Sequence, residues 1–281
     1  GKKEIAFLKK NRSPFYNIKT GNVSGYNDIG QVMFNTIITS KNKSDILKKF
    51  KKNIIRHFGP GSNYWKSLKQ RKKYKKIKWK KPLSGPWIHQ NFIETIKNIK
   101  AKKSITGGTK VNESDGFCAA LPYYFLVSKK EKEIKKVIRT VANSKINEVY
   151  GLARLKIIDL ASKGEQYPVQ KFIKKNKKNR YFKEVIMNIK KVFRLKKQNH
   201  ITLVRKLGKA CSDPGNFLSA THSIISSSNY KSAIIKTIKA GGCNCSRANF
   251  AGAYFAALKG TKDIPKDWIK KTKQAKKLLK L

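Results

Sequence analysis

Residues 240–253 read AGGCNCSRANFAGA and form the most distinctive local pattern in the chain. Two glycines, Gly241 and Gly242, precede a short polar run, and small apolar residues then recur with a helical period. The pattern predicts a loop that leads into the N-terminus of a helix, where free backbone N–H groups favour anionic ligands. The two glycines and Arg247 are therefore candidate phosphate-binding residues.

Outward from this stretch, the chain reads as helices separated by turn residues. Apolar residues recur at three- and four-residue spacing, and no segment shows the alternation typical of strands. We predict an all-α fold, a compact multi-helix arrangement that forms a single domain over residues 1–281 without internal repeats. The predicted helices cover residues 28–38, 44–57, 90–101, 114–127, 131–143, 145–162, 169–174, 182–195, 202–210, 215–227, 229–239, 246–258 and 265–279.

The balance of charge sets this chain apart from ordinary globular proteins. It carries 66 Lys and Arg against 15 Asp and Glu, a formal net charge of +51 in 281 residues. Such a charge destabilises an isolated compact state through self-repulsion, and a polyanion relieves it. We expect a polyanionic partner, with nucleic acid foremost because its phosphates release counterions when they are neutralised. An anionic membrane, acidic tubulin or a mineral surface meets the same need, and a merely solvated basic surface is the alternative to all of them.

Three basic segments, 71–81, 171–180 and 266–280, are candidates for that contact. The first reads RKKYKKIKWKK, and aromatic residues between basic ones can stack bases while their neighbours grip phosphates. The alternative for this segment is an exposed loop or helix whose aromatic residues pack inward. The candidate nucleic-acid-binding residues are Arg71, Lys72, Lys73, Lys75, Lys76, Trp79, Lys80, Lys174, Lys175, Lys177, Lys178 and Arg180.

The cysteines and the lengths of the apolar runs limit the cellular compartments in which we expect this protein. Four cysteines without a repeating spacing predict no disulfide framework, so we expect a reducing intracellular compartment, mitochondrial or cytoplasmic. No run of 18 apolar residues is present, which argues against a transmembrane segment. No signal peptide is visible at Gly1.

An ordered set of short motifs resembles the ADP-ribosylglycohydrolases over nearly the whole chain. The resemblance is greatest to the branch that includes jellyfish lens crystallins. It implies a compact all-helical fold with a cleft between the helix start at Asp28 and the Gly242 loop. It also implies that the family's early Gly-x-x-x-Gly-Asp segment would lie before Gly1, so that an N-terminal part of the fold is absent from this chain. The motifs are SGYND at 24–28, FGP at 58–60, GPWIH at 85–89, DPGNF at 213–217, GGCNCS at 241–246 and IPKDW at 264–268.

The same resemblance bears on catalysis. In the active members of the family that this chain resembles, two Mg²⁺ ions are held by two segments. One is an aromatic-Thr-Asp-Asp-Thr helix start, and the other is a Gly-Gly-Asp-x-Asp-Thr/Ser loop. Here the matching positions retain a single carboxylate, Asp28. Because Mg²⁺ prefers octahedral oxygen ligands, we predict no magnesium pair, no cofactor and no catalytic residue. The degenerate metal-site positions are Asn27, Asp28, Ile29, Cys243, Cys245 and Ser246.

The residues at these positions also allow other interpretations. Cys243 and Cys245 with His222 or His89 would suit Zn²⁺, and a Cys–His pair could in principle be catalytic at a helix N-terminus. Small buried thiols are the plainer reading. Asp28 is either a leftover metal ligand or the N-cap of the helix that starts there. Arg247 with the loop amides could retain binding of a nucleotide or ADP-ribose.

Together these features predict a non-enzymatic member of the family that acts as a structural, RNA-binding component of a large ribonucleoprotein such as an organellar ribosome, with other protein subunits as partners. One alternative is a structural protein on another polyanion, such as a microtubule, a mineral or a crystallin-like assembly. A second alternative is a residual ADP-ribosyl hydrolase with replaced ligands.

Overall fold

The computed structural model describes residues 5–9, 13–76 and 82–278, and within them the predicted all-α fold is confirmed. Two strands of two residues each, β1 (Tyr16–Asn17) and β2 (Leu83–Ser84), form a short parallel pair, which is too brief to leave an alternation in the sequence. The helices are α1 (Gly25–Ile38), α2 (Ile46–Phe58), α3 (Asn63–Lys76), α4 (Gln90–Lys100), α5 (Asp115–Leu126), α6 (Glu131–Val141), α7 (Lys145–Ser162), α8 (Pro168–Lys175), α9 (Lys183–Arg194), α10 (His200–Leu207), α11 (Gly215–Ile225), α12 (Tyr230–Ala240), α13 (Asn244–Lys259), α14 (Lys266–Lys271) and α15 (Lys273–Leu278).

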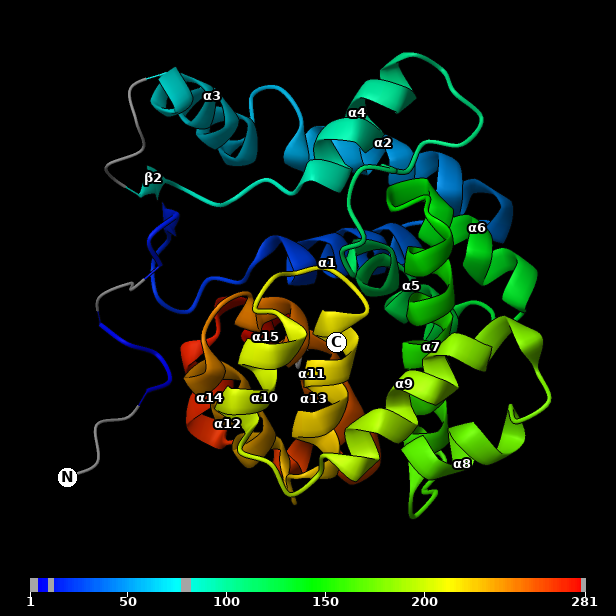
Figure 1. Cartoon of the computed structure of the whole chain (residues 1–281). Coiled ribbons are helices and arrows are strands. Elements are labelled where there is room, and N and C mark those ends of the chain that lie inside the picture. Colours follow the sequence, from blue (N-terminus) through cyan, green and yellow to red (C-terminus); the bar gives the residue numbers. More distant parts are fainter. Residues whose placement is uncertain (1–4, 10–12, 77–81, 279–281) are drawn as a thin grey trace.

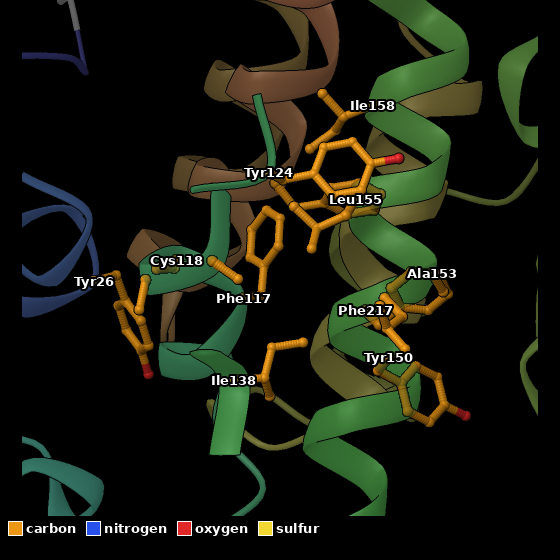
Figure 2. Packing of buried hydrophobic residues seen from close by; sticks show 14 of the residues in the cluster. Tyr26, Phe117, Cys118, Tyr124, Ile138, Tyr150, Ala153, Leu155, Ile158 and Phe217 are labelled. Atoms are coloured by element: carbon orange, nitrogen blue, oxygen red, sulfur yellow. The ribbon is translucent and has the colours of Figure 1, made fainter. Parts of the chain in front are cut away.

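The core is built around α5, α7 and α13. Helix α7 is buried along most of its length, and its buried residues include Asn147, Glu148, Arg154 and Asp159 beside the apolar ones. Helix α5 packs against α1, α6 and α7, while α13 packs against α7, α11 and α12. Figure 2 shows Phe117 and Tyr124 of α5 facing Leu155 and Ile158 of α7, with Ile138 of α6 close by.

Close approach of α5 to α6 depends on a glycine. A Cβ at Gly116 would lie 2.8 Å from the Cγ2 atom of Ile138 and 3.0 Å from its carbonyl oxygen. Those separations are shorter than van der Waals contact, so a larger residue would push the helices apart. This packing places the N-terminus of α5, and with it Asp115, next to the start of α1.

The helices fall on two sides of α1. Figure 1 shows α2, α3 and α4 on one side of it and the C-terminal group α10–α15 on the other. Because α1 packs against α2, α5 and α13, its N-terminal turn lies where these groups meet. That turn holds the first set of positions singled out in the sequence.

Most predicted helix ends lie within three residues of the observed ones, and three differences bear on the site or on the basic segments. Helix α1 begins at Gly25 rather than Asp28, and α3 begins at Asn63, so residues 71–76 end a helix rather than open a segment of their own. The predicted C-terminal helix over 265–279 is divided at Thr272, whose backbone is extended. Its hydroxyl donates to the Trp268 carbonyl at 2.8 Å, and the next amide donates to the Gly21 carbonyl instead of continuing the helix.

Candidate functional site

The loop before α13 meets the first turn of α1, as the family resemblance implied. Cys243 Sγ lies 3.9 Å from the Tyr26 hydroxyl of α1. The loop is held from the other side by Lys209, whose carbonyl accepts from the Cys243 amide at 2.8 Å. Gly242 has φ of +63°, and a Cβ there would lie 2.4 Å from the same carbonyl, so the position requires glycine.

Positions 27–29 on α1 do not present a metal site. Asp28 is not the N-cap, because the helix starts three residues earlier, after Ser24. Its carboxylate accepts a hydrogen bond from the Tyr64 hydroxyl at 2.5 Å and lies 3.8 Å from His57. Ile29 is fully buried in the core, and Asn27 is exposed. Asp28 is therefore the only carboxylate of this set, and it is already hydrogen-bonded within the protein.

The second set of positions, on the loop, is occupied by thiols and an internally bonded hydroxyl. Cys243 and Cys245 are half-buried. The Ser246 hydroxyl has the Cys243 carbonyl at 3.0 Å and the Cys243 sulfur at 3.2 Å as alternative acceptors for its one hydrogen, and it accepts from Asn216. Thiols are soft ligands, whereas Mg²⁺ takes hard oxygen ligands in near-octahedral geometry. The residues at both sets of positions therefore do not fit the magnesium pair that the family implies.

Cys243 nevertheless has an unusual environment. A hydrogen bond from the Cys211 thiol lowers its pKa to about 6, in spite of burial, which raises it. The Ser246 hydroxyl lies 3.2 Å from the sulfur and further favours the thiolate. The two thiols come from loops far apart in sequence, so the spacing of the cysteines alone gave no sign of this pair.

A buried ion pair, which the sequence analysis did not identify, lies beside the loop. Asp115 is fully buried at the start of α5, and one carboxylate oxygen lies 2.6 Å from His89 Nδ1. The other oxygen accepts from Asn91 at 2.9 Å, and Glu113 accepts from Tyr26 at 3.3 Å. Burial lowers the pKa of His89, but the charge and hydrogen bond of Asp115 outweigh it and raise the value to about 9.

His89, Glu113 and Asp115 each offer a ligand atom within 4.8 Å of the others, which is the spacing of a metal site. With no cation bound, the raised pKa keeps a proton on the His89 ring, so that His89 and Asp115 form an ion pair. Burial, together with the nearby Asp115 charge, raises the pKa of Glu113 to about 7. The zinc site suggested for Cys243 and Cys245 with His89 or His222 is not formed among the residues that the structure describes.

Arg247 lies inside the protein rather than at its surface. It is fully buried, and its guanidinium donates to the Gly241 carbonyl, which fixes the loop before α13. Its Nε and Nη1 groups have no hydrogen-bond partner within the described residues. Phosphate binding by Gly241, Gly242 and this arginine stays a prediction.

The basic segments carry mostly exposed side chains where the structure describes them. Residues 71–76 belong to α3, whereas Trp79 and Lys80 lie outside the described residues. Arg71 is an exception, because its guanidinium stacks over Trp87 at 4.7 Å and donates to the Ile88 carbonyl. In the second segment the exposed cations are Lys174, Lys175, Lys177, Lys178 and Arg180.

Three comparisons relate this chain to known proteins. A family model described as ADP-ribosylglycohydrolase matches residues 115–281. The chain is 26% identical over 292 residues to Crystallin J1A of Tripedalia cystophora, covering 99% of this chain and 83% of that protein. It is 24% identical over 283 residues to Crystallin J1B of the same organism, with the same coverage. A solved structure titled ADP-ribosylglycohydrolase-related protein complex has the same fold at 10% identity and a TM-score of 0.60, covering 93% of this chain and 80% of that one.

Proposed function

This chain belongs to the ADP-ribosylglycohydrolase family. We propose that it is a non-catalytic member that binds RNA as a structural component of a large assembly such as an organellar ribosome. The family resemblance drawn from the motifs is confirmed, and the relatives named above are crystallins. We further propose a reducing compartment, mitochondrial or cytoplasmic, and other protein subunits as partners. Among the described residues, no helix combines the length and apolarity that crossing a bilayer requires.

The loss of hydrolase chemistry is supported by the positions that would hold the metal ions. Of the six positions, one has a carboxylate, one has a buried isoleucine and two have thiols. Asp28 is bonded to Tyr64, and the buried acids nearby are paired with His89 and Tyr26. Two-metal hydrolysis needs oxygen ligands that bring two cations to one water, and this arrangement does not provide them.

The high net positive charge is the single observation on which the proposal of RNA binding rests. A formal net charge of +51 is retained on a fold whose core is otherwise well packed, and the exposed cations of 174–180 form one continuous basic segment. Contacts to phosphates position a protein on nucleic acid without reading its sequence. We therefore expect sequence-independent binding that depends steeply on salt.

The test is the affinity of the full chain for single-stranded RNA, measured by fluorescence anisotropy between 50 and 200 mM KCl. We expect log affinity to fall linearly with log salt, by about 0.7 for each phosphate contact. Replacing the five exposed cations of 174–180 with Gln should lower that slope by about 3.5. The matched control replaces five exposed lysines elsewhere, which are Lys97, Lys100, Lys102, Lys103 and Lys110. Affinity that ignores salt, or equal effects of both variants, would refute an interface at 174–180.

Catalysis is tested separately with an ADP-ribosylated substrate in the presence of Mg²⁺. We expect no release of ADP-ribose above the rate without protein. Mg²⁺-dependent release would show that replaced ligands sustain the reaction and would overturn the non-catalytic assignment.

The crystallin relatives favour one alternative, a structural protein that acts through another acidic surface or through self-assembly. Polyglutamate as a competitor in the same anisotropy assay distinguishes it. Equal affinity for polyglutamate and RNA at matched charge would favour the alternative, whereas preference for RNA supports the proposal.

A further inference from the structure

Two cysteines from separate loops meet beside the first turn of α1. Cys243 is the N-cap of α13, and Cys211 lies in the segment between α10 and α11. The Cys211 thiol donates a hydrogen bond to the Cys243 sulfur. Both side chains are half-buried, so each keeps some contact with solvent. Neither cysteine belongs to a basic segment, so the proposed binding of RNA does not explain the pair.

Backbone hydrogen bonds hold the two loops together. The Lys209 carbonyl accepts from the Cys243 amide at 2.8 Å, and the Asp213 amide donates to the Asn112 carbonyl at 2.8 Å. Cys211 is therefore held between two anchored residues. Its own backbone belongs to neither a helix nor a strand, so it can shift by the small distance that separates two hydrogen-bonded sulfurs from a covalent disulfide.

The surroundings of the Cys243 sulfur favour the thiolate. Besides the Cys211 thiol, its donors are the Ser246 hydroxyl at 3.2 Å and the Ser246 backbone amide in the first turn of α13. The N-terminus of a helix also attracts negative charge. The hydrogen bond from Cys211, with those from Ser246, outweighs burial and lowers the pKa of Cys243 to about 6. Because the thiolate is the nucleophilic form of cysteine, Cys243 is the attacking thiol of the pair.

The other two thiols of the chain are less suited to react with Cys243. Cys245 lies in the first turn of α13, where the helix fixes its backbone, and its thiol is hydrogen-bonded to Tyr16. Cys118 lies within α5 and is buried. Burial raises the pKa of both thiols. Cys211 is therefore the partner that the fold provides.

We infer that Cys243 and Cys211 form a peroxide-reactive pair, in which a hydroperoxide oxidises Cys243 and Cys211 then closes a disulfide. In the first step the Cys243 sulfur bonds to one oxygen of hydrogen peroxide and the O–O bond breaks. The other oxygen leaves as hydroxide and takes up the proton that the Cys243 thiol released, which gives water and a sulfenic acid. In the second step the Cys211 sulfur attacks the Cys243 sulfur, the S–O bond breaks, and the departing hydroxide takes the Cys211 proton. Two thiols and one hydrogen peroxide thus give one disulfide and two waters.

The first step prepares the second. The hydrogen bond to Cys243, together with burial, raises the pKa of the Cys211 thiol. Oxidation of Cys243 removes the negative charge that Cys211 faces, so Cys211 ionises more readily once its partner has reacted. Cys243 is therefore oxidised first, and Cys211 is the resolving thiol.

The experiment begins with the full chain, reduced and then freed of reductant. It is treated with equimolar hydrogen peroxide at pH 7, blocked with iodoacetamide and digested for non-reducing peptide mass spectrometry. We expect a cross-linked pair of peptides that contains Cys211 and Cys243. The free thiols, counted after unfolding, should fall from four to two, with Cys118 and Cys245 remaining free.

Three variants test the role of each thiol. Cys211→Ser keeps a hydroxyl donor toward Cys243 and should stop at the sulfenic acid, which dimedone traps as a stable adduct. Cys243→Ser should leave its remaining thiols free under the same treatment. Cys245→Ser is the matched control, because it removes a thiol two residues from Cys243, and it should form the disulfide as the wild type does.

The wild-type measurement alone can refute the pair, whatever the stability of the variants. Four free thiols after treatment overturn the inference, and so does a disulfide that joins Cys243 to Cys245 or Cys118. Absence of a dimedone adduct in Cys211→Ser, with the variant shown to be folded by thermal melting, also overturns it. The inference goes beyond the proposed function and does not rest on it, so failure of RNA binding leaves this chemistry in place.

Discussion

Replacing His89 with Gln tests the buried ion pair at the centre of the molecule. In the folded protein, the Asp115 carboxylate outweighs the effect of burial and holds the pKa of His89 at about 9, against 6.5 for an ordinary histidine. One unit of pKa difference corresponds to about 1.4 kcal/mol, so the protonated ring contributes on the order of 3 kcal/mol to the free energy of unfolding. In the variant, Asp115 keeps its Asn91 hydrogen bond but loses its counter-charge.

The sign of the pH dependence follows from the direction of the shift. A histidine whose pKa is raised on folding contributes its full stabilisation below pH 6.5, and this contribution is lost as the pH rises through 9. Urea unfolding of the wild type and of His89→Gln at intervals from pH 6 to pH 9.5 measures the difference between the two proteins. Groups shared by both proteins, including the many lysines, largely cancel in that difference.

We expect the free energy of unfolding of the wild type to exceed that of His89→Gln at pH 6. This difference should be smaller at pH 9.5 by about 3 kcal/mol. A difference that stays constant across this range would show that His89 is neutral in the fold. In that case Nδ1 would keep the hydrogen that faces Asp115, the Nε2 lone pair would be free, and the reading of His89 and Asp115 as an ion pair would be wrong.

Three further predictions concern single side chains. Arg154→Met leaves the buried Asp213 carboxylate without its two guanidinium hydrogen bonds of 2.8 and 2.6 Å, and should cost about 3–5 kcal/mol in urea unfolding; a loss under 1 kcal/mol would contradict this. Brief alkylation with iodoacetamide at pH 7, followed by peptide mass spectrometry, should modify Cys243 before Cys118, because the pKa of the first is lowered to about 6 and that of the second is raised by burial; the reverse order would contradict the thiolate assignment. Gly242→Ala should lower the melting temperature, because its Cβ would meet a backbone carbonyl oxygen at 2.4 Å, and an unchanged melting temperature would show that the loop is free to move.

Local pattern was enough to place most of the helices. The range of α7 follows from apolar residues that recur with a helical period over 145–162, and the loop before α13 was visible from its glycines. The burial of α7 on most of its faces, Arg154 included, was not predicted. The errors came where a distant contact competes with helix propensity. Thr272 ends α14 because the next amide is taken by Gly21, some 250 residues earlier in the chain, and no local signal carries that information.

The candidate site was less accessible to sequence reasoning, for the same physical reason. The proposed loss of metal ligands rests only on residue type at the motif positions, which can be read from the sequence. The pairing of His89 with Asp115, and of Cys211 with Cys243, depends on which loops the packing of α1, α5 and α13 brings together.

The most direct test of the account is the sedimentation of the native protein, isolated gently and run on a density gradient with and without ribonuclease. A structural RNA-binding role predicts that the protein migrates with a large particle and shifts to light fractions after ribonuclease treatment. Migration in a large particle that resists ribonuclease, or in light fractions before any treatment, would contradict that role and favour self-assembly or an acidic protein partner.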